Sequence, residues 1–155
     1  MAQVIPFKGF RYNPSKIGDL SKVMTPPYDV ISPAEQDRFY RMSQYNIIRL
    51  ELGKEEPADD EHNNKYTRAA EYLKDWIEEQ VLVQESQPSF YIYQQQFGLP
   101  NGNTYIRTGF VGLVRLEEFS KGVILPHENT LSKPKADRLR LMQACAANFS
   151  QIFAL

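Results

Sequence analysis

The sequence predicts an α+β fold, because helical and strand patterns intermingle along the chain. Three observations predict it: a capped helix start at Ser32, an amphipathic helical pattern that begins at Asn64, and two strand patterns joined by a turn with Asn101 and Gly102. We expect a mixed sheet that contains a β-hairpin and is flanked by about three helices. At 155 residues, the chain has the length of a single α+β domain over residues 1–155.

The first helix is predicted over residues 33–43. Ser32 is a favourable N-cap, Glu35 lies where it completes a capping box, and Pro33 suits the first helical turn. Apolar and polar residues then alternate over residues 46–52, a pattern typical of a half-buried strand.

A polar run over residues 54–63 predicts a solvated loop. From Asn64 to about Val81, apolar side chains recur at helical spacing, which predicts an amphipathic helix with one face on the core.

Two strands are predicted over residues 90–97 and 105–116, and the turn formers between them indicate a β-hairpin. The apolar run 123–125 predicts a further strand, and residues 138–147 predict the last helix.

Composition narrows the class of protein. The formal net charge of −1 gives no general attraction to nucleic acid, which argues against a nucleic-acid partner. No segment has the run of apolar residues that spans a membrane, and the N-terminus lacks the pattern of a secretory signal, so we expect a cytoplasmic protein. The single cysteine, Cys145, excludes an internal disulfide and is expected to be a small buried side chain.

The richest chemistry lies in residues 126–139, between the predicted strand 123–125 and the predicted last helix. This stretch contains histidine, carboxylates, hydroxyls, lysines and an arginine. A polar loop that leads into a helix N-terminus favours anions, because free backbone N–H groups and the helix dipole point toward it. We therefore expect the functional site here.

A second candidate segment is residues 25–32, where Pro26 and Pro27 stiffen the approach to Tyr28 and Asp29. These two side chains are candidates for substrate binding, and the alternative is a tight connection in which Asp29 assists the next helix cap. Arg49 and Arg107 interrupt apolar strand patterns, so they are candidates for substrate binding or for pairing with buried carboxylates. The alternative is that both occupy outward-facing strand positions.

The sequence resembles the bacterial and archaeal family known as domain of unknown function 1015. The resemblance is carried by the patterns PPYDVI at residues 26–31 and HE-x-T-x-x-x-P-K-x-D-R-L at residues 127–139, and it extends from about Pro6 to Leu155. Members of that family are considerably longer, so the resemblance implies an N-terminal portion whose partner is the C-terminal remainder of its own chain. More distantly, the family resembles ParB and sulfiredoxin-like domains, which include nucleotide-binding partition proteins and ADP- or ATP-dependent kinases of free serine.

These resemblances imply a nucleotide-dependent phosphotransferase that acts on a small hydroxylated metabolite such as free serine, with ADP or ATP as cosubstrate and Mg²⁺ as cofactor. Lysine, arginine and hydroxyl side chains would hold phosphate. Glu128 or Asp137 would hold Mg²⁺ or accept a proton, and His127 would orient the acceptor or act as base. The phosphate-binding candidates are Thr130, Ser132, Lys133, Lys135 and Arg138.

Several alternatives remain for the same residues. Asp137 could cap the last helix while Arg138 pairs with Glu117 or Glu118 and the lysines are solvated. His127, Glu128 and Asp137 could instead ligate a hydrolytic metal ion, although one histidine is weak evidence for zinc. The chain could also be a ParB-like nucleotide-binding regulatory or nucleic-acid-associated module without catalysis, or an interaction domain without a small ligand.

Overall fold

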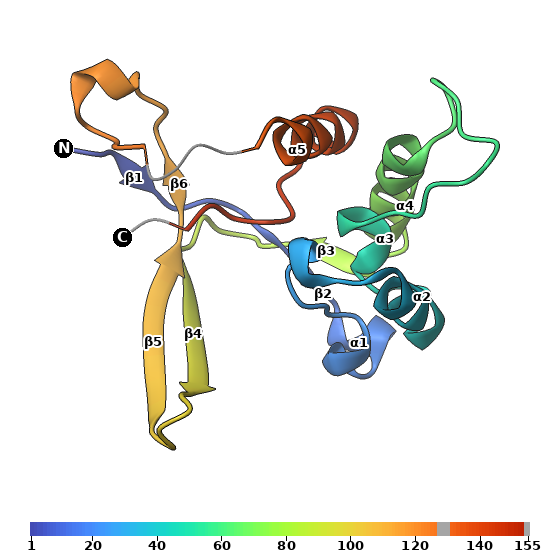
Figure 1. Ribbon diagram of the computed structural model, residues 1–155, viewed down its shortest axis with the longest axis horizontal. Coiled ribbons are helices and arrows are strands. Elements are labelled where there is room, and N and C mark those ends of the chain that lie inside the picture. Colours follow the sequence, from blue (N-terminus) through green and yellow to red (C-terminus); the bar gives the residue numbers. More distant parts are fainter. Residues whose placement is uncertain (127–130, 154–155) are drawn as a thin grey trace. The chain divides into compact units, whose positions relative to one another are not determined.

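The computed structural model describes residues 1–126 and 131–153 and has the expected α+β composition (Figure 1). The chain forms two compact units: Met1–Phe10 with Gln84–Asn129, and Arg11–Val83 with Thr130–Leu155. We call these the hairpin unit and the helical unit. The helices are α1 (Pro14–Ile17), α2 (Pro33–Met42), α3 (Ile48–Glu51), α4 (Lys65–Glu78) and α5 (Ser132–Cys145), with 3₁₀ turns at Leu20–Lys22, Tyr28–Val30 and Phe119–Lys121.

The strands pair two by two in the described part of the chain. They are β1 (Val4–Ile5), β2 (Phe10–Tyr12), β3 (Leu82–Gln84), β4 (Tyr91–Gly98), β5 (Thr104–Val111) and β6 (Leu113–Val114). β1 pairs with β6, β2 with β3, and β4 with β5. The strands therefore make three small sheets that include the predicted hairpin.

The core of the helical unit surrounds Trp76 of α4. Leu50, Val81 and Leu82 are buried beside it, and aromatic and aliphatic side chains from the rest of the unit cover this cluster. Tyr45 packs edge-on against the Trp76 ring with centroids 5.9 Å apart. Such burial of large apolar side chains is the main stabilising term for a domain of this size.

Helix α2 begins as predicted. The Ser32 side chain accepts a hydrogen bond from the Glu35 backbone N–H, and the Glu35 carboxylate accepts one from the Ser32 N–H, which completes the capping box. The Tyr28–Val30 turn precedes this cap, and Asp29 is exposed, so Ser32 rather than Asp29 caps the helix.

The strand predicted over residues 46–52 is wrong, because Ile48–Glu51 forms the one-turn helix α3. The buried Asn46 side chain accepts from the Ile48 N–H at 3.0 Å and donates to the Lys22 carbonyl at 2.7 Å. These bonds fix a turn at the point where a strand would have to extend. Ile48, Leu50 and Glu51 are all buried. The alternation of apolar and polar residues therefore does not mark a strand with one face exposed to solvent.

Residues 54–63 form the expected loop, and α4 follows it. Asn64 caps α4 by accepting from the Tyr66 and Thr67 N–H groups. The helix ends at Glu78, earlier than the predicted limit, because Gln80 takes a left-handed conformation with φ of 60°. Val81 is fully buried but lies just beyond the helix.

The hairpin unit contains the two strands predicted around Asn101-Gly102, with Gln95 opposite Arg107 and Phe97 opposite Tyr105. The second predicted strand is divided: β5 ends at Val111, and Leu113–Val114 form β6, which pairs with β1. Gly112 lies at the division, where a Cβ atom would lie 2.9 Å from the Phe90 ring.

Two predictions near the last helix are wrong. Residues 123–125 form no strand, since none of the described strands pairs with them and Leu125 is 75% exposed. Helix α5 begins at Ser132 instead of residue 138, with Pro134 in its first turn, where a missing N–H costs little. Residues 132–137, expected as part of the polar loop, are therefore helical.

Candidate functional site

Arg138 is the centre of a polar cluster in the helical unit. Its Nη1 atom donates to the Glu51 carbonyl oxygen at 2.9 Å and to the Glu51 carboxylate at 3.1 Å. Its Nε atom donates to the Asp137 carboxylate at 3.0 Å, and Nη2 bonds the same carboxylate oxygen. The face of the guanidinium lies against the Tyr28 ring, 4.0 Å from its centroid. Arg138 thus joins α5 to α3 and to the Tyr28–Val30 turn.

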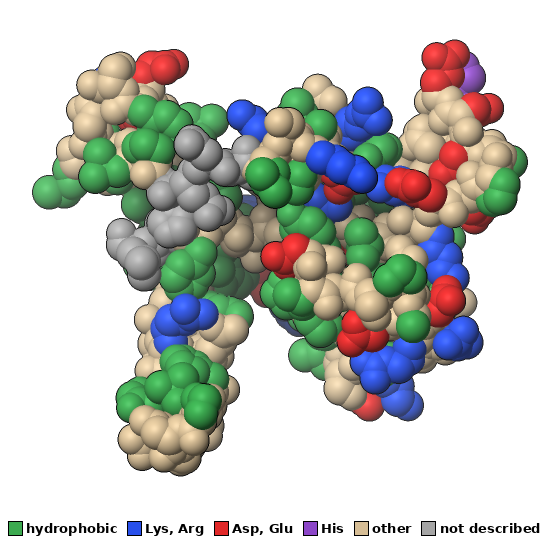
Figure 2. Space-filling model, in the orientation of Figure 1, with side chains coloured by type: hydrophobic (Ala, Val, Ile, Leu, Met, Phe, Trp, Pro, Cys, Tyr) green, Lys and Arg blue, Asp and Glu red, His purple; other side chains and the backbone are tan. Residues whose placement is uncertain are grey.

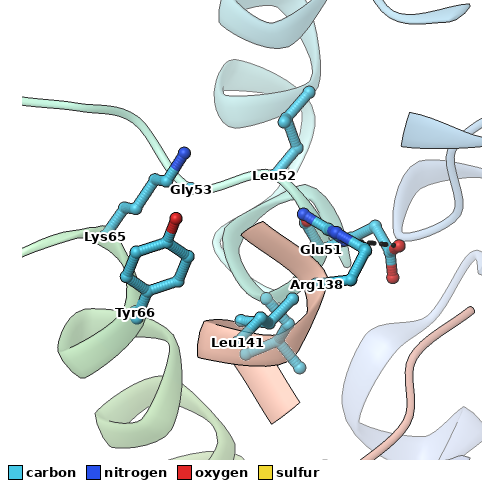
Figure 3. A pocket seen from close by; sticks show the side chains of 8 residues that line it. Glu51, Leu52, Gly53, Lys65, Tyr66, Arg138 and Leu141 are labelled. Carbon is cyan, nitrogen blue, oxygen red and sulfur yellow. Dashed lines mark hydrogen bonds and ion pairs between the residues drawn. The ribbon is translucent and has the colours of Figure 1, made fainter. Parts of the chain in front are cut away.

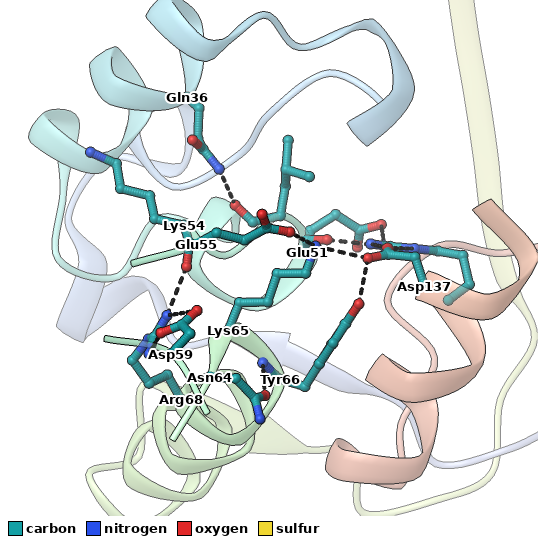
Figure 4. Close-up of polar contacts among 12 residues, drawn as sticks. Gln36, Glu51, Lys54, Glu55, Asp59, Asn64, Lys65, Tyr66, Arg68 and Asp137 are labelled. Carbon is teal, nitrogen blue, oxygen red and sulfur yellow. Dashed lines mark hydrogen bonds and ion pairs between the residues drawn. The ribbon is translucent and has the colours of Figure 1, made fainter. Parts of the chain in front are cut away.

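Asp137 extends this cluster to the start of α4 (Figure 4). The Tyr66 hydroxyl donates to its Oδ1 atom at 2.8 Å, and Lys65 Nζ lies 2.9 Å from the same oxygen. Burial of the carboxyl raises its pKa, but hydrogen bonds from Arg138, Lys65 and Tyr66 outweigh burial and lower the pKa to about 2. Asp137 is therefore a carboxylate with both oxygens occupied.

Glu51 is the most enclosed charge of the group, with 7% of its side chain exposed. Besides the bonds from Arg138, its carboxylate accepts from the Ser150 hydroxyl. A buried charge is tolerated when it is paired and hydrogen-bonded in this way. We call Glu51, Lys65, Tyr66, Asp137 and Arg138 the Arg138 cluster.

A small hollow borders this cluster (Figure 3). Its walls combine side chains of the cluster with Leu50, Gly53 and Leu141. Its free space of about 10 Å³ is close to what one water molecule needs, so it does not accommodate a nucleotide or a metabolite as it stands.

The charges of the Arg138 cluster compensate one another. Lys65 and Arg138 supply positive charge, while Glu51 and Asp137 supply negative charge, and Glu55 adds a further carboxylate 3.0 Å from Lys65 Nζ. An anion gains little from cations that are already paired. The Arg138 cluster is therefore a structural link between α3, α4 and α5.

The N-terminal turn of α5 has a different character. Leu131 is the N-cap residue and supplies no side-chain hydrogen bond. Ser132, Lys133 and Lys135 are exposed, and the structure shows no ion pair of either lysine with another described residue. Backbone N–H groups at a helix start, a hydroxyl and cations are groups that proteins use for phosphate. Because Pro134 has no N–H and the Lys135 N–H donates to the Leu131 carbonyl, the backbone donors here are those of Ser132 and Lys133.

Three predicted site residues, His127, Glu128 and Thr130, lie outside the described residues. The remaining candidates are Tyr28, Asp29, Arg49 and Arg107. Tyr28 contacts Arg138, whereas Asp29 is exposed and Arg107 lies on β5 of the hairpin unit, where it donates to the Gln95 side chain. The structure therefore brings Tyr28, Asp137 and Arg138 together, and Arg107 belongs to the other unit.

Arg49 lies on α3 and not on a strand. Its guanidinium is 4.4 Å from the Tyr40 ring centroid and 5.7 Å from that of Tyr72, and its Nη2 atom donates to the Tyr40 carbonyl at 3.0 Å. Its Nε atom is buried without a hydrogen-bond partner. These contacts describe an arginine packed between aromatic rings.

Within the helical unit, Arg138 pairs with Glu51 and Asp137. Its alternative pairing with Glu117 or Glu118, which belong to the hairpin unit, stays a prediction. Asp137 does not cap α5, because it lies inside the helix. Cys145 is partly buried, and burial raises the pKa of its thiol to about 11. His62, in the loop 54–63, has 85% of its side chain open to solvent.

Sequence reasoning missed Glu51, Lys65, Tyr66 and Ser150. Each of them contacts Arg138 or one of its carboxylate partners from a distant point in the chain. No local pattern marks such contacts. The one available signal was a carboxylate, Glu51, within a run of buried apolar positions.

A family model described as "Protein of unknown function (DUF1015)" matches residues 4–155. The chain belongs to this family. Membership in DUF1015 confirms the family resemblance of the PPYDVI and HE-x-T-x-x-x-P-K-x-D-R-L patterns.

No curated protein and no solved structure matches this DUF1015 chain. The resemblance to ParB and sulfiredoxin-like domains therefore has no support from these comparisons. Over residues 1–126 and 131–153, no helix has the length and apolar character to cross a membrane. The same residues contain no group of three or more His, Cys, Asp or Glu side chains placed to hold a metal ion.

Proposed function

We propose that this chain binds the phosphates of ATP or ADP at the N-terminal turn of α5 and transfers a phosphoryl group to a small hydroxylated metabolite such as free serine. The observation that carries the proposal is this helix start, which has no side-chain cap and exposes Ser132, Lys133 and Lys135. The helix has 14 residues, enough for a dipole that favours negative charge at its first turn.

In this proposal, Lys133 and Lys135 contact phosphate oxygens and Ser132 donates a hydrogen bond to them. Arg138 does not contact phosphate in this proposal, because its guanidinium already bonds Glu51 and Asp137 and packs on the Tyr28 ring. It holds α5 at a fixed position and so orients the first turn. Positioning of this kind contributes to phosphoryl transfer, whose catalysis consists mostly of alignment and charge stabilisation.

Asp137 does not fit the role of general base or Mg²⁺ ligand. A carboxyl whose pKa is lowered to about 2 takes up a proton poorly near neutral pH, and its oxygens accept bonds from Arg138, Lys65 and Tyr66. The proposal therefore assigns proton transfer to His127 or Glu128. Mg²⁺, when bound, would neutralise phosphate charge, with Glu128 as its protein ligand.

A second candidate is a nucleotide-binding module without catalysis. Asp137 is the candidate acid or base among the described residues, and its lowered pKa and occupied oxygens do not suit that role. This observation favours the module without catalysis. Both candidates share the phosphate site and differ in turnover.

The test is ³¹P NMR of the protein with ATP or ADP, Mg²⁺ and serine, or with other hydroxylated metabolites in its place. The kinase proposal predicts a new phosphomonoester signal, loss of that signal in Glu128→Gln, and retention of nucleotide binding by this variant. Nucleotide binding without a phosphorylated product from any acceptor contradicts the kinase and supports the module. Arg140→Ala serves as the control, because Arg140 is exposed on the same helix.

A further inference from the structure

The β4–β5 hairpin exposes an unusual amount of apolar surface for two strands. Figure 2 shows hydrophobic side chains over the surface of this hairpin. Ile92 is 75% exposed, Ile106 is 63% exposed and Phe110 is 60% exposed. An isolated two-stranded hairpin is at best marginally stable in water, and a further strand or a covering element is what normally stabilises it.

The exposed residues sort onto two faces through the register of the hairpin. Ile92 lies opposite Phe110, and Gln96 lies opposite Ile106, so Ile92, Ile106 and Phe110 share one face. Phe97 lies opposite Tyr105 on the other face, where the two rings stack with centroids 6.1 Å apart. Both faces thus expose apolar side chains.

The two outer edges of this hairpin are also open. Within residues 1–126 and 131–153, β4 and β5 form a two-stranded sheet that no third strand extends. Natural proteins protect open edges with lysine, proline or bulges. β4 contains no charged residue and no proline along its eight residues. Its outer edge has the features of a strand that pairs with another strand.

Charge distinguishes β4 from β5 as an edge for pairing with a second copy of the chain. Arg107 is the one charged residue between Phe90 and Val114, and it lies on β5. If two copies paired through β5 with the two-fold axis at residue 106, 107 or 108, the two Arg107 side chains would lie directly opposite or diagonal to each other, which is unfavourable. Pairing through β4 brings no charges together. A second copy of the same chain therefore meets no repulsion at the β4 edge.

We propose that this chain forms a two-fold symmetric dimer in which β4 pairs antiparallel with β4 of a second copy. Opposed residues in an antiparallel pair point to the same face of the sheet. The two-fold axis must therefore lie where one residue is opposite the same residue of the second copy. With the axis at Gln95, Tyr93 lies opposite the partner's Phe97 on both sides of it, which gives two aromatic cross-strand pairs. The result is a four-stranded sheet with its apolar faces continuous across the axis.

The experiment is sedimentation velocity from low to high micromolar protein. Its key variant is Gln94→Lys with Gln96→Lys, because residue 94 faces the partner's Gln96 in this register and lysine then opposes lysine twice. The matched control is Thr104→Lys with Thr108→Lys, which adds the same charge to β5. These positions lie opposite Gly98 and Gln94 within the hairpin.

The wild type and the β5 variant should dimerise with similar affinity, while the β4 variant dimerises about tenfold more weakly or worse. A monomeric wild type, equal dimerisation of all three proteins, or loss of the dimer only in the β5 variant overturns the proposal. Circular dichroism checks that both variants are folded. Hydrogen exchange of the wild type gives an independent reading: β4 amides should exchange more slowly at high protein concentration, and unchanged exchange contradicts the dimer.

Discussion

The guanidinium of Arg138 lies over the ring of Tyr28, 4.0 Å from its centroid. This contact joins the two sequence patterns by which the chain resembles its family, PPYDVI and HE-x-T-x-x-x-P-K-x-D-R-L. Arg138 also bonds Glu51 and Asp137, so it holds three distant segments of the helical unit together.

Replacement of Arg138 by alanine should destabilise the helical unit strongly. The change leaves the Glu51 carboxylate, 7% exposed, without its cation. Loss of one partner of a buried pair costs about 3–5 kcal/mol, and the partial exposure of Arg138 places the expected loss near 3 kcal/mol. Urea denaturation followed by Trp76 fluorescence measures it. Arg140→Ala should change the free energy of unfolding little. Equal effects of the two substitutions would contradict the structural role of Arg138.

Stability should fall in acid because of Asp137. Hydrogen bonds from Arg138, Lys65 and Tyr66 outweigh burial and lower its folded-state pKa to about 2, below the ordinary value of 3.8. The carboxylate thus contributes stability that is complete above about pH 4 and is lost as the pH falls toward 2. After allowance for solvent screening, this contribution is about 1–2 kcal/mol.

Asp137→Asn isolates that contribution from other acidic groups. The variant should be less stable than the wild type at pH 6, and the difference should shrink as the pH approaches 2. Denaturant titrations at several pH values measure the two curves. Parallel curves for the two proteins would show that Asp137 is not the group responsible.

Asn46 should be essential for α3. Its amide donates to the Lys22 carbonyl and accepts from the Ile48 N–H, and the side chain is fully buried. Asn46→Ala leaves both backbone groups without these partners, which should cost about 1–3 kcal/mol. The exposed Asn103→Ala is the control. A thermal unfolding midpoint unchanged by Asn46→Ala would refute the assigned role.

Cys145 should react slowly with alkylating agents. Burial raises the pKa of its thiol to about 11, so the reactive thiolate is scarce near neutral pH. We expect iodoacetamide at pH 8 to modify the native protein much more slowly than the urea-unfolded protein. Equal rates would mean that the thiol is open to solvent, contrary to its partial burial.

Local signals predicted the elements that carry their own caps and turns. The capping box at Ser32, the amphipathic pattern of α4 and the Asn101-Gly102 turn each depend on neighbouring residues, and each element formed. The failures occurred where distant contacts decide. Residues 46–52 became a buried helical turn because Asn46 bonds Lys22, and a run of three apolar residues at 123–125 has no described strand partner.

The sequence predicted only part of the candidate site. The importance of the segment around Asp137 and Arg138 followed from its residue types, but their partners Glu51, Lys65 and Tyr66 did not, since tertiary packing alone brings them together. The early start of α5 at Ser132 moved the helix N-terminus toward the lysines and away from Arg138. That shift is why we keep Lys133 and Lys135 as the proposed phosphate contacts and no longer include Arg138.

The central claim is that nucleotide phosphates bind at the first turn of α5, and isothermal titration with ATP or ADP in the presence of Mg²⁺ tests it most directly. The test variant is Lys133→Ala with Lys135→Ala. The control is Lys16→Ala with Arg140→Ala, which removes the same charge from other exposed positions. The account predicts saturable binding by the wild type and the control, with affinity at least about tenfold weaker in the test variant. Absence of binding by the folded wild type, or equal affinity in all three proteins, would contradict it.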